Sequence, residues 1–256
     1  MKKVLALALA LCMSLCLLAC GDKETGKTFT VGFDAEFPPY GYMDDNGEYV
    51  GFDLSLAEEV CNRRGWELVK RPIDWDSKDM ELSSGTIDCI WNGFTINGRE
   101  DSYTWTVPYV DNSQVFVVSK DSGISTPADL AGKNVGVQRD SSALAALNED
   151  ATELRDSFAN LIEYADYNTA FLDFTGGAID AVAMDIGVAN YQIESRDGEY
   201  VILDEKLATE QYGVGFLKGN DELKNKVEET LLEMVKDGTF AKIAEEWGLS
   251  DAVCLK

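Results

Sequence analysis

Apolar and polar residues follow two patterns along this chain. Short apolar runs predict β-strands at Phe29–Phe33, Glu67–Lys70, Ile87–Trp91, Val135–Val137, Ile179–Met184 and Tyr212–Phe216. Segments whose apolar residues recur at helical spacing predict helices at 53–65, Lys78–Ser84, Ser142–Asn148, Ile186–Ile193, Glu222–Lys236 and Phe240–Trp247. Strands that alternate with helices in this way indicate α/β layers with mostly parallel sheets.

The helix predicted at 53–65 has both a start signal and a stop signal. Asp53 stands just before the first apolar position and is a candidate N-cap. Gly65 follows the last apolar position, and glycine accepts the left-handed backbone that ends many helices.

One short pattern occurs twice. Ser84–Ile90 and Gly176–Val182 both contain a helix-stop glycine, an Ile-Asp pair and the first residues of a predicted strand. Two copies of a helix-turn-strand unit predict two lobes of similar construction. A cleft between two α/β lobes is a usual place for a small ligand.

The N-terminus has the features of an export signal. Lys2 and Lys3 precede an apolar segment, Val4–Ala19, that is too short to favour a membrane-spanning helix. The sequence Leu-Leu-Ala-Cys that ends at Cys20 resembles the bacterial lipoprotein box, in which cleavage before the cysteine is followed by its acylation. We therefore predict a signal peptide at 1–19, lipidation (palmitate) of Cys20 and a lipid-anchored tether at 20–27. The alternative is an ordinary secretory signal cut nearby, and either cleavage places the protein outside the cytoplasmic membrane.

The composition excludes several classes of mechanism. The 256 residues include 22 Lys and Arg, 46 Asp and Glu, and no histidine, for a formal net charge of −24. Without histidine there is no Ser-His-Asp triad, no Cys-His dyad and no histidine-ligated metal. Nucleic acid is not an expected partner, because binding it needs a basic surface. We expect no metal and no cofactor.

Three cysteines remain beyond the signal and the predicted lipid site. Cys89 lies within an apolar run and is expected in the core. Cys61 and Cys254 are the one pair that we consider for a disulfide, with free thiols as the alternative.

Several motifs together resemble the polar amino acid-binding proteins of ABC importers. They are Asp34–Tyr42, Gly47–Asp53, Gly93–Ile96, Pro108-Tyr109 and Tyr212–Phe216, and the resemblance runs from about Phe29 to Trp247. It implies an α/β, two-lobed periplasmic-binding-protein-like fold of type II, with a two-segment hinge and a ligand cleft between the lobes. Lobe 1 would comprise 28–110 plus 210–256, and lobe 2 would comprise 111–209.

A closed cleft must satisfy the carboxylate, the ammonium and the side chain of a free amino acid, because an unpaired buried charge is costly. Arg99 is the expected carboxylate partner, since its planar fork makes two parallel hydrogen bonds. By resemblance, Thr95 adds its hydroxyl and amide, and Gly93 adds backbone contacts. Arg99 follows Thr95 by four residues where the family has five, so the loop is shorter here. The alternative is a solvated Arg99 paired with Glu100 or Asp101.

Two further anchors are expected from lobe 2. Ser141 and Ser142 precede a predicted helix, whose free N–H groups suit an anion. The alternative is a plain N-cap, and the resemblance favours binding. Asp185 ends a predicted strand and matches the family acid that binds the ligand ammonium; its alternative is an N-cap for the helix at Ile186.

By resemblance, five residues line the pocket for the ligand side chain: Asp34, Phe37, Trp75, Asn92 and Gln138. None of the five is basic, so an acidic ligand side chain would meet no cationic partner. Two aromatic rings and a carboxylate favour lysine, arginine or ornithine. Glutamine or another polar neutral amino acid is the alternative.

The sequence therefore predicts an extracellular substrate-binding lipoprotein of an amino-acid ABC importer, anchored by its lipid to the outer face of the cell membrane. The expected partners are a free amino acid and a membrane permease, and the expected state is a monomer. It is not expected to be an enzyme; a dehydratase or a ligand sensor on the same fold are the alternatives. The chain has no histidine, and its other side chains do not titrate near neutral pH unless they are strongly perturbed. Ligand binding is therefore expected to be nearly independent of pH between about pH 6 and 8.

Overall fold

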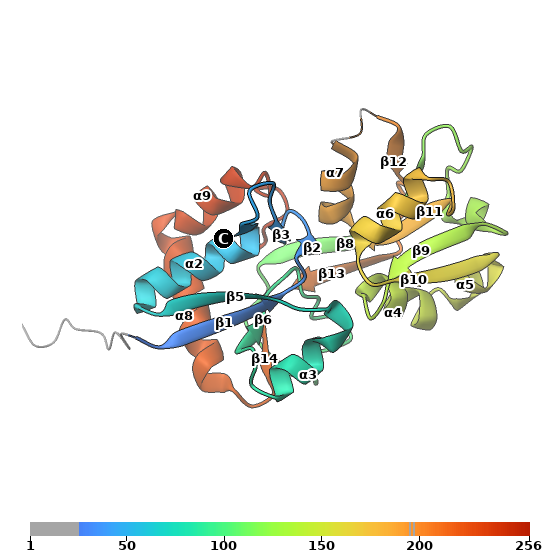
Figure 1. Cartoon of the computed structure of the whole chain (residues 1–256). Coiled ribbons are helices and arrows are strands. Elements are labelled where there is room, and N and C mark those ends of the chain that lie inside the picture. The colour runs from blue at the N-terminus through green and yellow to red at the C-terminus, as the bar shows by residue number, and fades with distance from the viewer. Residues whose placement is uncertain (1–25, 195, 197) are drawn as a thin grey trace, which may run out of the picture.

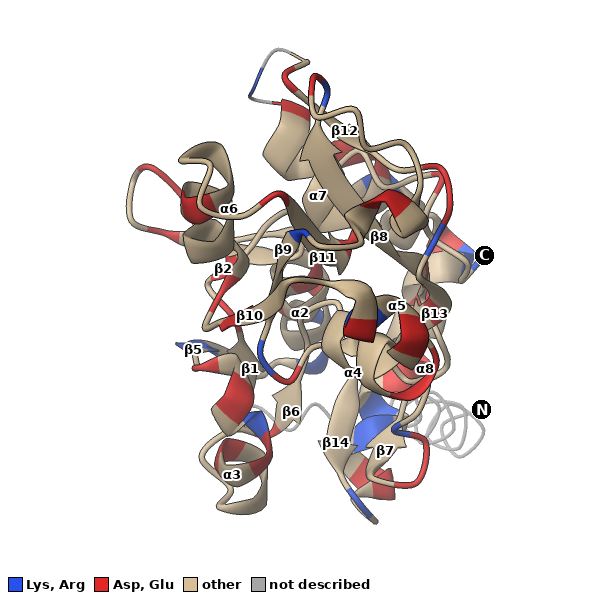
Figure 2. Cartoon of the chain, turned by 90° about the vertical axis from the view of Figure 1, so that its right-hand side faces the viewer, with Lys and Arg blue, Asp and Glu red and all other residues tan. Residues whose placement is uncertain are grey.

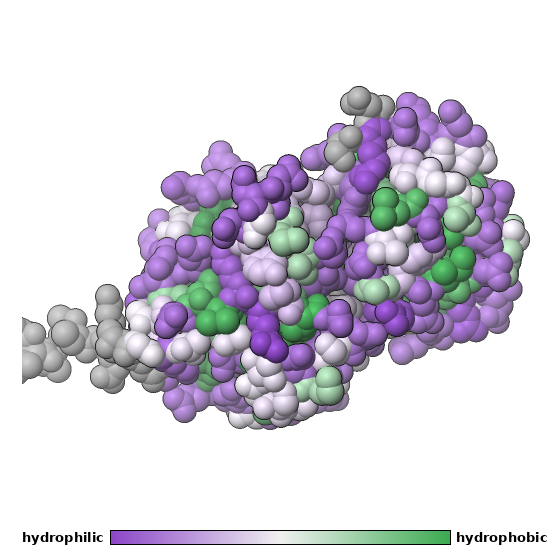
Figure 3. Space-filling view, viewed as in Figure 1, coloured by the Kyte–Doolittle hydropathy of each residue, from purple (hydrophilic) through white to green (hydrophobic). Residues whose placement is uncertain are grey.

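The computed structural model describes residues 26–194, 196 and 198–256, which form two lobes lying side by side (Figure 1). The predicted signal peptide, Cys20 and most of the tether lie outside the described residues. None of the helices in the described part is long and apolar enough to cross a membrane. Hydrophilic residues cover most of the face shown in Figure 3.

Lobe 1 is built on a five-stranded sheet. Its order is β5 (Glu67–Pro72), β1 (Thr28–Phe33), β6 (Cys89–Ile90), β14 (Gly215–Leu217) and β7 (Tyr103–Trp105). β1 is parallel to β5 and β6, whereas β14 is antiparallel to β6 and β7. Its other elements are β2 (Glu36–Phe37), β3 (Gly41–Met43), β4 (Tyr49–Val50), α2 (Phe52–Arg64), η1 (Trp75–Ser77), α3 (Lys78–Ser83), α8 (Asp221–Asp237) and α9 (Thr239–Glu246).

Lobe 2 is built on a six-stranded mixed sheet. Its order is β10 (Asn160–Tyr164), β9 (Asn134–Gln138), β11 (Ala181–Asp185), β8 (Val110–Ser119) and β12 (Tyr200–Ile202), and β13 (Ala208–Tyr212) also pairs with β8. The helices of this lobe are η2 (Pro127–Leu130), α4 (Ser142–Glu149), α5 (Thr152–Ser157), α6 (Tyr167–Thr175) and α7 (Ile186–Glu194).

Two strands join the lobes. β8 and β13 are antiparallel, with Tyr212 opposite Val110 and Ala208 opposite Gln114, and they lie side by side between the lobes in Figure 1. The chain leaves the sheet of lobe 1 after Trp105 and returns to it at Gly215. The exact lobe boundaries, predicted after 110 and before 210, stay a prediction.

Most predicted elements are present, and two differ in an instructive way. Only Cys89–Ile90 of the predicted run Ile87–Trp91 is a strand. The predicted strand Tyr212–Phe216 is split into β13 and β14. It is split because the chain changes sheets there, and between the two strands the Gly213 N–H donates to the Phe94 carbonyl (3.0 Å).

The N-cap prediction for Asp53 is wrong. α2 begins at Phe52 with Gly51 as its N-cap, and Asp53 is buried in the first turn. Its Oδ2 accepts hydrogen bonds from the Gly93 N–H (2.6 Å) and the Tyr109 hydroxyl (2.9 Å). Gly51 is required because its φ is +143° and a Cβ there would lie 2.2 Å from the Tyr40 carbonyl oxygen. The Asp53 carboxylate in α2 therefore stabilises the loop that contains Gly93, which is distant in sequence.

The repeated pattern is the same structural unit in both lobes. Gly85 and Gly177 end their helices with φ of +75° and +74°. The Asp88 N–H donates to the Thr30 carbonyl (2.8 Å), and its carboxylate accepts the Thr30 N–H (2.7 Å). Asp180 makes the same two bonds to Asn134, at 2.8 Å each. Each aspartate therefore sets a central strand beside its parallel neighbour.

The three described cysteines are free thiols, so the disulfide considered between Cys61 and Cys254 is not formed. Cys61 faces the core of lobe 1 from α2, where burial raises its pKa to about 12. Cys254 lies instead beside the start of the hinge, where its N–H donates to the Tyr109 carbonyl (3.1 Å).

Candidate functional site

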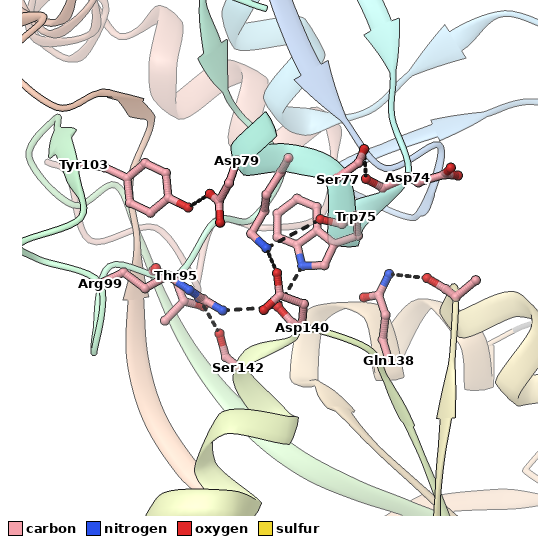
Figure 4. Close-up of polar contacts among 12 residues, drawn as sticks. Asp74, Trp75, Ser77, Asp79, Thr95, Arg99, Tyr103, Gln138, Asp140 and Ser142 are labelled. Atoms are coloured by element: carbon pink, nitrogen blue, oxygen red, sulfur yellow. Dashed lines mark hydrogen bonds and ion pairs between the residues drawn. The ribbon is translucent and has the colours of Figure 1, made fainter. Parts of the chain in front are cut away.

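The predicted site residues gather where parallel strands of the two lobes end. Asp34 follows β1 and Asn92 follows β6 in lobe 1, while Gln138 ends β9 and Asp185 ends β11 in lobe 2. The carboxyl ends of parallel strands commonly form the ligand crevice of an open α/β sheet. Contacts across this cleft are drawn in Figure 4.

Arg99 reaches across the cleft. Its Nη1 donates to the Ser142 hydroxyl (3.0 Å) and to the Thr95 carbonyl (3.3 Å), and its Nη2 donates to the Asp140 carbonyl (3.3 Å; Figure 4). The guanidinium carbon lies 5.3 Å from the centroid of the Phe94 ring. The shortened loop therefore still brings Arg99 to the helix that starts in lobe 2.

The two serines have separate roles. Ser141 is the N-cap of α4, and its hydroxyl accepts the Leu144 N–H (3.1 Å). Ser142 is the first residue of the helix and faces Arg99. The N-cap alternative therefore holds for Ser141. Ser142 lies where the binding alternative would need a hydroxyl, facing the predicted partner of the ligand carboxylate.

Asp140 is the point in lobe 2 on which donors from lobe 1 converge. Its carbonyl accepts hydrogen bonds from Trp75 Nε1 (3.2 Å) and Arg99 Nη2 (3.3 Å), and its carboxylate pairs with the Lys78 ammonium. Its φ is +53°, a left-handed value found at no other described residue except glycines. Such a backbone is sparsely populated and persists where surrounding contacts hold it.

Asp185 is buried at the end of β11 beside the hinge. Its Oδ1 accepts hydrogen bonds from Asn112 Nδ2 (2.7 Å), Gln114 Nε2 (2.7 Å) and the Tyr212 hydroxyl (2.5 Å). Burial, followed by the neighbouring Glu210 carboxylate, raises the pKa of Asp185 to about 7. A buried carboxylate in this place needs either a cation or a proton.

Asp34 forms the other acidic position in the cleft. Its Oδ2 accepts a hydrogen bond from Gln138 Nε2 (2.7 Å), which belongs to the other lobe, and Asn92 Oδ1 accepts the Asp34 N–H (2.9 Å). Burial raises the pKa of Asp34 to about 6. The flat pH expectation assumed that no group is strongly perturbed, and burial of Asp34 departs from that assumption.

The aromatic residues have different surroundings. Phe37 packs against Tyr40 and Tyr167, with ring centroids 5.8 and 6.0 Å away. Trp75 meets the Phe94 ring edge to face at 5.5 Å. Gly93 has a φ of +55°, and a Cβ there would lie 2.8 Å from the Phe37 ring and 3.0 Å from the Tyr212 ring. That glycine is needed for the close approach of the loop.

Lys78 is a cleft residue that sequence reasoning missed. Its side chain is 2% exposed, its Nζ pairs with the Asp140 carboxylate, and it lies 5.1 Å from the centroid of the Trp75 ring. None of the five predicted pocket residues is basic, but Lys78 places a cation beside one of them, Trp75. The available signal was spacing, because Lys78 follows Trp75 by one helical turn.

Glu210 and its neighbours on the hinge were missed as well. Glu210 Oε1 accepts hydrogen bonds from the Thr95 hydroxyl (2.8 Å), Asn112 Nδ2 (2.7 Å) and Gln114 Nε2 (2.8 Å). Asn112 and Gln114 alternate along β8 and so share one face, and Glu210 lies opposite Asn112 on β13. The signal in the sequence was the polar character of Asn112 and Gln114 within a strand that is largely buried, which is typical of residues that line a site.

Two cavities flank Arg99. One of about 490 Å³ is lined in part by Arg99, Ser141, Ser142 and Glu210. Another of about 340 Å³ is lined in part by Lys78, Arg99 and Asp140. The described residues contain no cluster of metal-ligating side chains. The site thus offers cationic groups, hydroxyls and a helix N-terminus at one end and carboxylates at the other.

Residues 29–250 match the family of bacterial extracellular solute-binding proteins, family 3. The L-cystine-binding protein TcyJ of Escherichia coli strain K12 is 30% identical over 228 residues, covering 88% of this chain and 84% of that protein. A substrate-binding protein of an ABC uptake transporter from Streptococcus pneumoniae, solved with bound histidine, has a TM-score of 0.85 and 35% identity over 89% of this chain and 94% of that chain. An ancestral arginine-binding protein bound to arginine has a TM-score of 0.79 and 36% identity, over 86% and 97% of the two chains.

These likenesses agree with the layout of the sheets and of the cleft. The predicted two-lobed α/β fold of type II is confirmed, and so is the family resemblance of the sequence. The chain belongs to the bacterial extracellular solute-binding proteins, family 3.

Proposed function

We propose that this chain captures a free amino acid outside the cytoplasmic membrane and delivers it to the permease of an ABC importer. The observation that carries the proposal is the contact of Arg99 in lobe 1 with Ser142 at the start of α4 in lobe 2 (3.0 Å). An α-carboxylate between these groups would meet a guanidinium, a hydroxyl and a helix N-terminus. The comparisons support it, since similar proteins carry cystine, histidine or arginine in their names.

The opposite end of the cleft suits the α-ammonium. Asp185 is buried and pairs with no cation among the described residues, so a ligand ammonium would supply the missing charge. Closure of the lobes would then remove water from both ends of the ligand and strengthen each contact. Binding the two charged ends of one small zwitterion explains why an acid and a base are held apart in one cleft.

A basic amino acid such as arginine, lysine or ornithine is the ligand that we propose first. The cleft holds four acids, Asp34, Asp140, Asp185 and Glu210, against the two cations Lys78 and Arg99. A ligand with a net positive charge reduces that imbalance, and a carboxylate such as Asp34 and an aromatic ring such as Trp75 suit a guanidinium or an ammonium on an aliphatic stem. Acidic residues are also spread over both lobes in Figure 2, which favours the approach of a cation.

An amino acid with a second carboxylate, such as cystine, is the other candidate. The buried Lys78 favours it, because this ammonium lies near Trp75 and could exchange Asp140 for a carboxylate at the far end of the ligand. The cystine-binding relative supports the same class. The side chain of glutamine or of another polar neutral amino acid would form hydrogen bonds with Asn92 and Gln138 rather than pair with Asp34 or Lys78.

We also propose that the mature protein is a monomer held on the outer face of the membrane by a lipid on Cys20. The lipobox-like sequence supports this placement. Replacing Cys20 by serine in the expressing bacterium should release the protein from the membrane fraction. Membrane association that survives this change would contradict the lipid anchor.

A screen of amino acids by thermal melting tests the proposed function. At a hundredfold excess over Kd, a true ligand stabilises the folded protein by about 2.7 kcal/mol. The screen should include arginine, lysine, ornithine, histidine, glutamine and cystine, and the bound compound should be recovered unchanged. No stabilisation by any amino acid would reject the proposal, and recovery of a converted product would favour a dehydratase instead.

A further inference from the structure

Two buried carboxylates share one set of donors beside the hinge. The Oδ1 of Asp185 and the Oε1 of Glu210 both lie 2.7 Å from Asn112 Nδ2. The same two oxygens lie 2.7 and 2.8 Å from Gln114 Nε2. Because each oxygen is so close to the same nitrogens, the two carboxylates are near neighbours, and both residues are buried (4% and 7% exposed).

This pair has no cation of its own. Among the described residues, neither Asp185 nor Glu210 takes part in an ion pair. Their other donors there are the hydroxyls of Tyr212 (2.5 Å) and Tyr167 (3.5 Å) on Asp185 and of Thr95 (2.8 Å) on Glu210. Two negative charges that are buried and close together repel each other strongly. One of them therefore needs a proton or a cation to remain there.

The network is also short of hydrogen-bond donors. The Oδ1 of Asn112 and the Oε1 of Gln114 are buried and accept no hydrogen bond from any described residue. A ligand ammonium brings three N–H donors and a positive charge, whereas a carboxylic acid brings one O–H donor. Either the ligand ammonium or a proton on a carboxylate would supply the missing donor and reduce the negative charge, so the two are alternatives at this site.

The structure assigns Glu210 to the ammonium site beside Asp185: we propose that the two carboxylates share one proton in the empty cleft and release it when the ligand ammonium enters. The inference rests on the proposed function. The exchange conserves charge, because the pair goes from one negative charge to two while gaining one positive charge from the ligand. The proton passes to solvent, and no bond other than the O–H is broken.

The surroundings support an exchange near neutral pH. The titratable side chains that face the pair are Tyr40, Tyr167 and Tyr212, and their pKa values are raised well above 10 by burial, so they remain hydroxyls. Arg99 is one step removed, since it donates to the carbonyl of Thr95 (3.3 Å). Burial and Glu210 raise the pKa of Asp185 to about 7, so the pair begins to lose its proton in that range.

Calorimetric titration with L-arginine at pH 6.5, in two buffers of different ionisation enthalpy, measures the protons released. The wild-type protein should release between about half a proton and one proton per ligand, falling toward none at pH 8.5, while its affinity rises over the same range. Glu210→Gln should bind more weakly and release fewer protons, because the repulsion that helps to hold a proton on Asp185 is removed while its burial remains. Glu163→Gln, an exposed change in lobe 2, should behave as wild type.

Two results would overturn the inference: wild-type binding without proton release, or equal release by Glu210→Gln and wild type. A second measurement needs no ligand. Between pH 6 and 8.5 the melting temperature of the empty wild-type protein should fall, because ionisation forces two buried charges together, and Glu210→Gln should fall less. Identical profiles also reject the shared proton. Absence of binding by every amino acid in the screen, with the expected melting profiles intact, would instead reject the proposed function.

Discussion

The two ends of the cleft are built differently. At the end that holds Arg99, contacts run between lobes, from Arg99 to Ser142 and Asp140 and from Lys78 to Asp140. At the end that holds Asp185, the acid and its partners Asn112, Gln114 and Tyr212 lie on the neighbouring strands β11, β8 and β13 of one sheet. The first end is therefore complete only when the lobes meet, whereas the second is largely formed within lobe 2 and its hinge.

This difference assigns separate tasks to the two ends. Groups that meet only on closure are suited to report that a ligand is present and to hold the lobes together. Groups fixed on one sheet are suited to receive the ligand before closure. Mutations at the Arg99 end should therefore act on affinity and release, and mutations at the acidic end should act mainly on pH dependence.

Removal of Arg99 should give the largest effect. Arg99→Ala should weaken binding of the cognate amino acid by about 3–5 kcal/mol, because the ligand carboxylate would be left half paired in a closed cleft. Isothermal titration calorimetry measures the change. Arg155→Ala is a matched control, since Arg155 pairs with Asp156 at the surface of lobe 2 (2.6 Å), and it should alter affinity by less than about 1 kcal/mol. Equal effects of the two variants would contradict the assignment of Arg99 as the anchor.

The acid that supports the binding loop should govern the pH dependence of stability. Burial raises the pKa of Asp53 from 3.8 to about 7. The folded protein therefore binds more protons than the unfolded chain between these values, so stability falls as the pH rises toward 7. Asp53→Asn keeps the bonds from Gly93 and Tyr109 and removes the charge.

Between about pH 5 and pH 7, Asp53→Asn should lose roughly 2 kcal/mol less free energy of unfolding than the wild type. Urea unfolding at several pH values measures this difference. Asp45→Asn changes an exposed acid nearby and should leave the profile unaltered. A parallel shift of the Asp53→Asn profile, with no change in its slope, would contradict the role given to the buried carboxyl.

Lys78 distinguishes the two proposed ligand classes. Lys78→Met should weaken cystine binding about tenfold or more, because the far carboxylate loses its cation, a difference of about 1.4 kcal/mol. Arginine binding should change less, since its side chain brings no carboxylate. Competition titrations with both amino acids give the ratio of affinities. Lys242→Met, at an exposed position of α9, is the control, and an unchanged ratio in Lys78→Met would remove Lys78 from ligand selection.

The adjacent serines should give the smallest and most selective effects. Ser141→Ala should lower the free energy of unfolding by about 1 kcal/mol through loss of the N-cap, with little change in affinity. Ser142→Ala should do the reverse, weakening ligand binding by about 0.5–1.5 kcal/mol through loss of one hydrogen bond. Thermal melting and calorimetry on both variants separate the two roles. The same pattern in both would show that only one role exists for the pair.

Local patterns predicted the elements well because local physics decides them. Helix stops such as Gly65, apolar periodicity and the repeated unit with Asp88 and Asp180 depend on a few neighbouring residues. The expected anchors Arg99, Ser142 and Asp185 stay predictions, but two of them were placed by local signals: Ser142 begins α4 and Asp185 ends β11. Their chemistry, a guanidinium, a hydroxyl and a carboxylate, follows from the residue type alone.

Predictions failed where partners are distant in sequence. Asp53 looks like a helix cap, but in the fold it meets Gly93 and Tyr109. Lys78 looks like a surface lysine in a charged helix, but the closing lobe covers it with Asp140. The free thiols Cys61 and Cys254 show the same limit, since sequence spacing says nothing about which core each residue faces.

By itself, the sequence determined the α/β alternation, the two similar lobes and the family, because these depend on periodicity and residue chemistry, and it predicted charged anchors for a ligand from residue type. Only the tertiary structure decided how those charges are matched. It brings Lys78 to Asp140, and it buries Asp185 beside Glu210, which raises the pKa of Asp185 to about 7. Burial and pairing across a fold depend on long-range contacts, and a chain without histidine thereby acquires groups that titrate near pH 7.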